Sequence, residues 1–329
     1  MCISIAPVTF GNTVTGLYEA DENTHVIFYQ NTVSGASNLR RGRSGGAPML
    51  SMTAPSTRGR RGSTAKTPSN WNTGRKTGSD AANGNALVIP ILTDDFDSIK
   101  LLRDTASTPD LLKDLRRAVQ PPASRGGLRR GSAKGISFGA DAVVIESFDI
   151  YTLVLASRAS LIPDAVKAIE SRKRPPLAKE TFAALEKWYD CPFAVACFNN
   201  EDAGEAKPIA YAYQPKYPDQ FLIYTLDGHD GVVPNLDATV ELDHAVFVGS
   251  YRASTGRTVN YSDSIPASLK KYLPVKVVGT AFPKGTRLIN GDILVAVDDV
   301  VEGKFEAFRV LPPNAPDRAP VSLQDAIGG

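Results

Sequence analysis

The chain has few of the side chains that form disulfides, bind metals or mark membrane spans. Among its 329 residues are three cysteines, three methionines, three histidines and two tryptophans. The odd cysteine count, without framework spacing, argues against a disulfide scaffold. No run approaches the roughly 18 apolar residues of a spanning helix, and residues 1–10 lack the basic start and apolar run of a signal peptide. The sequence therefore predicts a cytoplasmic protein with no membrane segment, no cofactor and no metal site.

Acidic residues are absent from residues 38–78. The same stretch carries nine basic side chains, which are Arg40, Arg41, Arg43, Arg58, Arg60, Arg61, Lys66, Arg75 and Lys76. The net charge of the whole chain is +2, so the remaining positions sum to about −7. Gly, Ser, Thr, Pro and Arg dominate the stretch, a composition that predicts a flexible segment. Such uneven charge indicates a polyanionic partner more strongly than the overall charge does.

A second arginine-rich stretch repeats a piece of the first. Residues 60–63 and 129–132 are the same tetrapeptide, Arg-Arg-Gly-Ser. Arginine binds phosphate through paired N–H donors, and neutralising several phosphates releases counterions. The predicted polyanion-binding residues are Arg40, Arg41, Arg43, Arg58, Arg60, Arg61, Arg75, Lys76, Arg129 and Arg130. Two alternatives stay open, namely contact with acidic surface on a neighbouring subunit and a solvated segment without a partner. The tetrapeptide also resembles a basophilic kinase site, with Ser63 and Ser132 as acceptors.

Short apolar segments rich in β-branched and aromatic residues recur along the chain and predict strands. Residues 1–10, 12–20 and 25–33 predict a three-stranded meander, and residues 85–92 a buried strand. Residues 93–106 predict a helix that begins at Thr93 or Asp94. Residues 286–297 predict a hairpin with Asn290 and Gly291 in its turn. Further helices are expected at 107–119, 163–171, 177–189 and 265–273, and further strands at 141–148, 151–157, 192–198, 207–213, 219–226, 238–251 and 274–282.

These patterns predict an α+β fold with two β-rich lobes flanked by a few helices. The strand pattern of the first half recurs in the second, which makes an internal duplication one interpretation. The predicted domains are a first lobe at 1–157 with the basic insertion at 38–78, a second lobe at 158–310, and a Pro-rich tail at 311–329.

Three blocks of the sequence resemble a group of uncharacterised bacterial proteins. That group opens with a cysteine and a short β-meander, continues with an asparagine-led strand, and later has a strand pair followed by an "Asp-His-Thr"-like strand. The matching blocks here are Cys2 with the strands after it, residues 85–92, and residues 208–248, within residues 1–250. The resemblance implies a shared fold and no established activity. The segment 38–78 is outside the pattern and resembles an insertion.

Cys2 is the candidate catalytic residue. Removal of Met1 would leave Cys2 at the N-terminus, where its α-amine can act as the base for its own thiol, as in N-terminal nucleophile hydrolases. No partner residues for this chemistry stand out nearby. The alternative is a small apolar side chain at the start of a strand.

A group of carboxylates and imidazoles lies between residues 227 and 244. It contains Asp227, His229, Asp230, Asp237, Asp243 and His244. Imidazole and carboxylate can bind a metal together, but Asp and Gly also form turns. Adjacent strand residues such as Asp243 and His244 are expected to face opposite sides, so no metal site is predicted. Cys191 and Cys197 are expected to be packing residues.

The sequence thus favours a non-enzymatic assembly component or nucleic-acid binder, which is expected to form a homo-oligomer or a larger assembly. Its arginine-rich segments would engage a polyanion or a neighbouring subunit. The alternative is an N-terminal-nucleophile hydrolase that uses Cys2, so whether the protein is an enzyme stays open.

Overall fold

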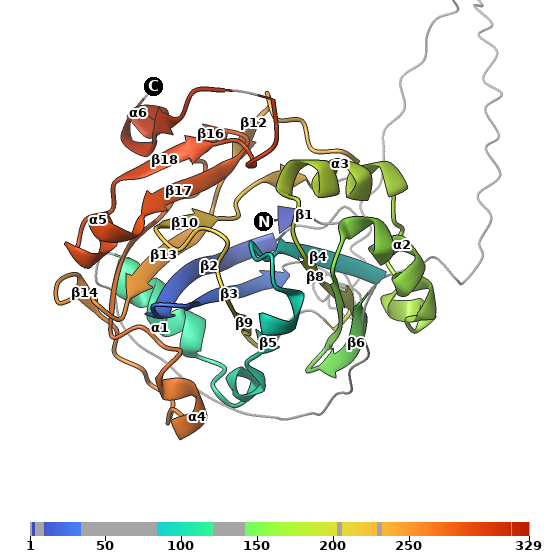
Figure 1. The fold of residues 1–329 in the computed structure, drawn as a ribbon, viewed down its shortest axis with the longest axis horizontal. Helices are drawn as coiled ribbons and strands as arrows, with labels where there is room; N and C mark the ends of the chain where they lie inside the picture. Colours follow the sequence, from blue (N-terminus) through green and yellow to red (C-terminus); the bar gives the residue numbers. More distant parts are fainter. Residues whose placement is uncertain are drawn as a thin grey trace, which may run out of the picture. The chain divides into compact units, whose positions relative to one another are not determined.

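A computed structural model describes residues 2–3, 10–33, 84–120, 142–202, 206–228, 232–316 and 318–328. The chain divides into two units, residues 1–34 with 82–329 and residues 35–81, and every described residue belongs to the first. Figure 1 shows this unit as a set of sheets with short helices at their margins.

The largest sheet has seven strands in the order β14-β15-β13-β2-β3-β9-β5. All its neighbouring strands are antiparallel except β2 and β13, which are parallel. The strands are β2 (Phe10–Asp21), β3 (Thr24–Val33), β5 (Lys100–Leu101), β9 (Ile209–Tyr213), β13 (Ala245–Ser250), β14 (Arg257–Thr258) and β15 (Lys276–Ala281).

Alternating side chains of β3 fill two cores on opposite faces of this sheet, as the two-residue period of a strand requires. Val26 and Phe28 pack in the core that also holds the buried face of α1 (Leu111–Val119). Ile27 and Tyr29 pack in the second, larger core. The helix therefore covers one face of the sheet, and the other sheets cover the opposite face.

The parallel pair of β2 and β13 approaches closely at Gly16. A Cβ atom at this position would lie 2.3 Å from the carbonyl oxygen of Phe247 and 2.6 Å from its ring. Phe247 is the register partner of Gly16 and is fully buried. Only glycine leaves room for the aromatic ring at this contact, because any side chain would collide with backbone.

A four-stranded antiparallel sheet has the order β4-β8-β7-β6. Every residue of β4 and β8 is buried, which explains their largely apolar sequences, each with one buried asparagine near an end. Two helices lie beside this sheet in Figure 1. The elements are β4 (Gly84–Pro90), β6 (Val143–Phe148), β7 (Tyr151–Ala156), β8 (Phe193–Asn199), α2 (Ile162–Ala165) and α3 (Lys179–Tyr189), with 3-10 turns at Ala159–Leu161, Val166–Ala168 and Ser171–Lys173.

The third sheet has the order β10-β17-β18-β19, and its neighbouring strands are antiparallel. Its red and orange strands lie near the C-terminus in Figure 1. The strands are β10 (Gln220–Ile223), β17 (Asp292–Ala296), β18 (Ala307–Val310) and β19 (Val321–Ser322). Smaller elements complete the unit: β1 (Cys2–Ile3) with β11 (Asp227–Gly228), β12 (Thr239–Glu241) with β16 (Arg287–Ile289), α4 (Ala267–Lys270), α5 (Val297–Val301) and α6 (Leu323–Gly328).

A buried ionic cluster lies at the start of β17. The Asp292 carboxylate accepts hydrogen bonds from the Tyr189 hydroxyl at 2.7 Å and from the backbone N–H groups of Thr225 and Leu226, each at 3.0 Å. The Arg309 guanidinium donates to the Ile289 carbonyl at 2.7 Å and to the Thr225 hydroxyl. Asp292 and Arg309 are both 0% exposed. The cluster therefore holds two charged side chains inside the core, with the second terminal nitrogen (Nη2) of Arg309 left without a hydrogen-bond partner among the described residues, and both side chains are sensitive to substitution.

The predicted α+β class is confirmed, since mixed sheets dominate the structure and a few short helices flank them. Strands from both predicted lobes share sheets: β2 and β3 pair with β13 and β9, and β4 and β7 pair with β8. The predicted boundary at residue 157 does not coincide with a division between sheets. The internal duplication and the 311–329 tail stay predictions.

The helix predicted at 93–106 is wrong. The segment forms a 3-10 turn at Phe96–Ser98, the short edge strand β5, and a second 3-10 turn at Arg103–Ser107. The Asp95 carboxylate accepts from the backbone N–H groups of residues 97 and 98, which tightens the first turn. The backbone of β5 then pairs with β9 instead of continuing as a helix. The Leu102 N–H also donates to the carbonyl of Ala210 at 2.9 Å.

Three strand predictions also need correction. The expected hairpin at 286–297 is absent, because β16 pairs with β12 while β17 pairs with β10 and β18. The expected long strand at 238–251 is divided into β12 and β13. The first predicted strand is not part of a meander in the described residues: β1 pairs with β11, and β2 with β3. The other predicted strands and helices correspond to observed elements, although α1 begins at Leu111 and α2 covers only Ile162–Ala165.

Candidate functional site

All ten predicted polyanion-binding residues lie outside the described residues. They are Arg40, Arg41, Arg43, Arg58, Arg60, Arg61, Arg75, Lys76, Arg129 and Arg130. Ser63 and Ser132 are outside them as well. Their role stays a prediction from the sequence.

Cys2 is placed only through its backbone. It lies in β1, where its register partner is Asp227, and its side chain is outside what the structure describes. Its proposed role as a nucleophile stays a prediction.

The other two thiols are packing residues, as the sequence predicts. Cys191 is 6% exposed and Cys197 is fully buried. Burial raises the pKa of the Cys191 thiol far above its usual range and raises that of Cys197 to about 12. Both therefore stay protonated at neutral pH, and a protonated thiol is a poor nucleophile.

A thiol count on the folded protein is expected to separate Cys2 from the other two cysteines. Cys191 and Cys197 should react with a thiol reagent at pH 7 only after denaturation, because they are buried and protonated. Any rapid reaction of the folded chain then comes from Cys2, and a Cys2→Ala variant should abolish it. Rapid native labelling that persists in Cys2→Ala would contradict the burial of the other thiols. Intact mass shows in the same sample whether Met1 is removed, which the hydrolase alternative requires.

Among the described residues, the His and Asp side chains between residues 227 and 244 are not gathered into a group of three or more that could hold a metal ion. His229 and Asp230 lie outside those residues. His244 is 4% exposed, and its Nδ1 lies 3.2 Å from an Asp243 carboxylate oxygen. The hydrogen bond to His244 lowers the pKa of Asp243. The expectation that these two side chains face apart is wrong, because β13 begins only at Ala245 and residues 243 and 244 precede the strand.

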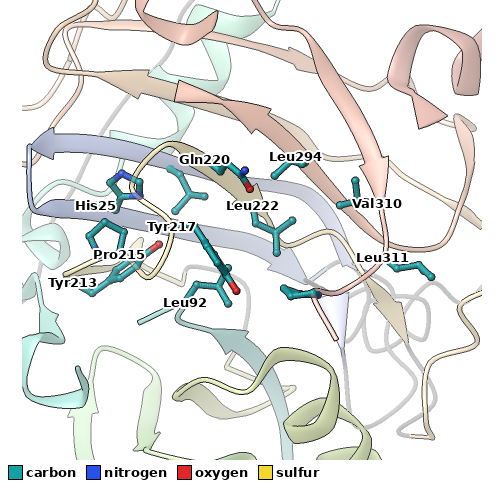
Figure 2. Close-up of a pocket in the computed structure, with 12 residues that line it drawn as sticks. His25, Leu92, Tyr213, Pro215, Tyr217, Gln220, Leu222, Leu294, Val310 and Leu311 are labelled. Atoms are coloured by element: carbon teal, nitrogen blue, oxygen red, sulfur yellow. The ribbon is translucent and has the colours of Figure 1, made fainter. Parts of the chain in front are cut away.

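A pocket of about 190 Å³ lies between the seven-stranded sheet and the third sheet. Figure 2 shows His25, Tyr213 and Pro215 at one end of it and Val310 and Leu311 at the other. Its lining residues come from β2, β3, β9, β10, β17, β18 and the segments beside them, and none has a formal charge when histidine is neutral. They are Leu17, His25, Leu92, Tyr213, Pro215, Tyr217, Gln220, Leu222, Leu294, Val310, Leu311 and Pro313.

His25 is the most deeply buried polar residue of this pocket, with an exposed fraction of 2%. Its ring lies 5.0 Å from the Phe221 ring and 6.3 Å from the Tyr213 ring, measured between centroids. Burial lowers the pKa of His25 to about 4, and a hydrogen bond to the Pro218 carbonyl only partly opposes this. The imidazole is therefore neutral at pH 7, with one nitrogen as a donor and the other as an acceptor.

The pocket has a buried floor and a more exposed rim. Leu17, Leu92 and Leu222 are at most 8% exposed, whereas Tyr217 is 39% exposed. Gln220 is also exposed at the rim. The Tyr217 hydroxyl and the side-chain amide of Gln220 form no hydrogen bond within the described part of the chain. This arrangement, an apolar floor with a few polar groups, is typical of small-molecule sites.

Comparisons with known proteins assign no family. No family model matches the chain, and no curated protein matches it. The solved structures similar to it include baculovirus P35 (11% identity, TM-score 0.37, 75% of this chain and 67% of that chain). Another is the caspase-8/P35 complex (12% identity, TM-score 0.34, 73% of this chain and 63% of that chain). At these identities and TM-scores the likeness establishes neither a fold family nor a function, and the resemblance to bacterial proteins stays a prediction.

Within the described ranges, no helix combines the length and the apolar character needed to cross a membrane.

Proposed function

We propose that the chain is a non-enzymatic binding protein whose arginine-rich segments engage a polyanion or a neighbouring subunit. The observation that carries the proposal is the separation of charge along the sequence. Residues 38–78 and 121–140 together contain thirteen basic and no acidic residues, so the rest of the chain sums to −11. A nucleic acid would be repelled by the acidic part and attracted by the two basic segments.

The composition of the basic segments favours phosphate over a single carboxylate as the group they bind. Arginine outnumbers lysine in both segments, and its planar guanidinium binds phosphate oxygens in pairs. The frequent glycines let the backbone follow an irregular polyanion. Neutralising several phosphates then supplies affinity that does not depend on sequence.

Two exposed carboxylates on the described part of the chain support the subunit version of the proposal. Asp21 and Glu22 are exposed at the turn between β2 and β3. Arg252 joins this end of β2 to α5, since its guanidinium lies 3.1 Å from the Glu19 carboxylate and 3.7 Å from that of Asp298. A basic segment of a second copy would find complementary charge here. In this version the protein is a cytoplasmic homo-oligomer.

The salt dependence of binding tests the nucleic-acid version. We expect single-stranded RNA or DNA to bind, with log K falling by about 0.7–0.9 per phosphate contact for each tenfold rise in salt. Replacement of six arginines by serine should reduce that slope by about four to five if each contacts one phosphate. The six are Arg40, Arg41, Arg43, Arg58, Arg60 and Arg61. Titrations of a fluorescent oligonucleotide at several salt concentrations provide the measurement.

A matched control removes the same charge from the surface of the described unit. Six exposed basic residues are replaced by serine, namely Lys179, Lys187, Lys270, Lys271, Lys284 and Arg287. This variant should keep the wild-type slope. Sizing of the wild type and of both variants, with and without nuclease, distinguishes nucleic acid from subunit contact. If the arginine variant keeps wild-type binding, salt response and oligomer size, the proposed function is wrong.

A further inference from the structure

We propose that the pocket beside His25 binds a small uncharged aromatic molecule with one hydrogen-bond donor, of the phenol or indole class. Nothing in the proposed polyanion function requires this site, because the pocket is formed by described residues whereas the arginine-rich segments lie elsewhere in the sequence.

The volume of the pocket limits the size of the group that it can enclose. At about 190 Å³ it is somewhat larger than the roughly 150 Å³ apolar cavity known to take up benzene. One six-membered ring or a fused pair of small rings fits this volume. Drug-sized ligands require pockets of roughly 300 Å³ or more. The pocket is therefore suited to a compact ring.

The lining of the pocket selects for an uncharged ligand. Of its twelve lining residues, none is Asp, Glu, Lys or Arg, and the neutral state of His25 adds no charge at pH 7. A carboxylate or an ammonium group would lose its hydration without gaining a counter-charge. Leu17, Leu92 and Leu222 provide the apolar floor against which a ring can bury its faces.

His25 determines where the polar group of the ligand lies. One ring nitrogen donates to the Pro218 carbonyl. The second nitrogen is then an acceptor, and no residue in the described ranges donates to it. A ligand N–H or O–H directed at this nitrogen would satisfy it, whereas a ligand without a donor would leave it unpaired. The aromatic rings of Tyr213 and Phe221 hold the imidazole in place.

Three related compounds test the charge and donor requirements together. Indole, 1-methylindole and indole-3-acetate are titrated separately into the full chain, with isothermal titration calorimetry and methyl NMR shifts of the leucines as readouts. Indole is expected to bind and to shift the signals of Leu92, Leu222 and Leu294. 1-Methylindole, which lacks the donor, should bind about three- to tenfold more weakly. Indole-3-acetate should show no binding, because its carboxylate has no partner in the pocket.

Variants of the pocket provide the controls. Leu294→Trp and Val310→Phe each fill part of the cavity from a half-buried position and should abolish indole binding. Val275→Phe adds the same kind of bulk at a residue that is 67% exposed and outside the pocket, and it should leave binding unchanged. Having two filling variants protects the test if one of them fails to fold, which the dispersion of the amide NMR spectrum would reveal.

Substitution of the histidine separates the donor requirement from general hydrophobic uptake. His25→Leu should bind indole and 1-methylindole about equally, because the acceptor nitrogen is gone. Absence of indole binding to the wild type, or indole binding that survives both filling variants, overturns the proposal. A preference for indole over 1-methylindole that persists in His25→Leu overturns the role given to His25. None of these outcomes bears on the arginine segments, so this proposal and the proposed function fail independently.

Discussion

Replacing Asp292 by alanine is expected to lower the free energy of unfolding by about 3–5 kcal/mol. The substitution leaves the Tyr189 hydroxyl and the N–H groups of Thr225 and Leu226 without their acceptor inside the core. It also removes the negative charge that stabilises the buried Arg309 guanidinium, whose pKa burial already lowers to about 10. Urea unfolding followed by circular dichroism measures the loss.

Two further substitutions show whether the cluster accounts for this loss. Asp298→Ala removes a carboxylate of the same type whose side chain is 91% exposed, and it should change the stability by less than about 0.5 kcal/mol. Tyr189→Phe removes one of the three donors to Asp292 and should have a smaller effect than Asp292→Ala, about 1–2 kcal/mol. A loss below about 1 kcal/mol for Asp292→Ala would mean that solvent reaches the cluster.

The stability of the protein is expected to fall by about 3 kcal/mol between pH 7 and pH 4 through His25 alone. The pKa of His25 is about 4 in the folded chain, against 6.5 for a free imidazole. Between these values the unfolded chain binds a proton that the folded chain does not, so stability rises with pH over this window. The contribution is fully present above pH 6.5 and is lost as the pH falls towards 4.

Charged neighbours do not account for this shift. It comes from burial, and the Pro218 carbonyl opposes it. The titratable residues paired with His25 in the sheet are Glu19 on β2 and Tyr213 on β9. Glu19 forms an ion pair with Arg252. Burial raises the pKa of the Tyr213 hydroxyl, which therefore stays neutral.

The His25→Gln variant isolates the contribution of the histidine. Urea unfolding of both proteins at pH 4, 5, 6 and 7 gives two stability curves, and the carboxylates titrate alike in both. The wild-type curve should fall about 3 kcal/mol further than that of the variant. Parallel curves would show that His25 is accessible to protons in the folded state.

Much of the fold could be predicted from apolar periodicity alone. The largely apolar sequence of β4 and the amphipathic pattern of α1 each correspond to an element in the structure. Where a prediction was wrong, the backbone forms hydrogen bonds with side chains or with strands distant in the sequence instead of with its local neighbours. Asn290 is an example: its side-chain nitrogen Nδ2 donates to the Asp227 and Asn235 carbonyls, and its side-chain oxygen Oδ1 accepts from the Asp227 N–H. These tertiary bonds hold the segment where a local hairpin turn was expected.

The candidate site was much harder to predict than the fold. His25 stands at the start of an apolar strand, and no neighbouring residue in the sequence marks it as part of a site. The pocket forms only when β3, β10 and β17 come together from distant parts of the chain. The charge pattern points instead to residues 38–78 and 121–140, where the predicted arginines lie outside the described residues. The periodicity of apolar residues in a sequence indicates which face of a strand or helix is buried. A pocket depends instead on which strands pack against one another in the folded chain.

The parallel pairing of β2 with β13 also sets a constraint on how the chain is made. Ser250 donates a hydrogen bond to Glu19, 231 positions earlier in the sequence. At the usual 5–20 residues per second, a ribosome needs on the order of 10–50 s to synthesise that interval. Throughout this time one edge of the β2–β3 hairpin lacks its final neighbour, and unpaired strand edges promote association between nascent chains. Premature termination before residue 245 would make this exposure permanent, so truncated translation products should depend on chaperones or be degraded.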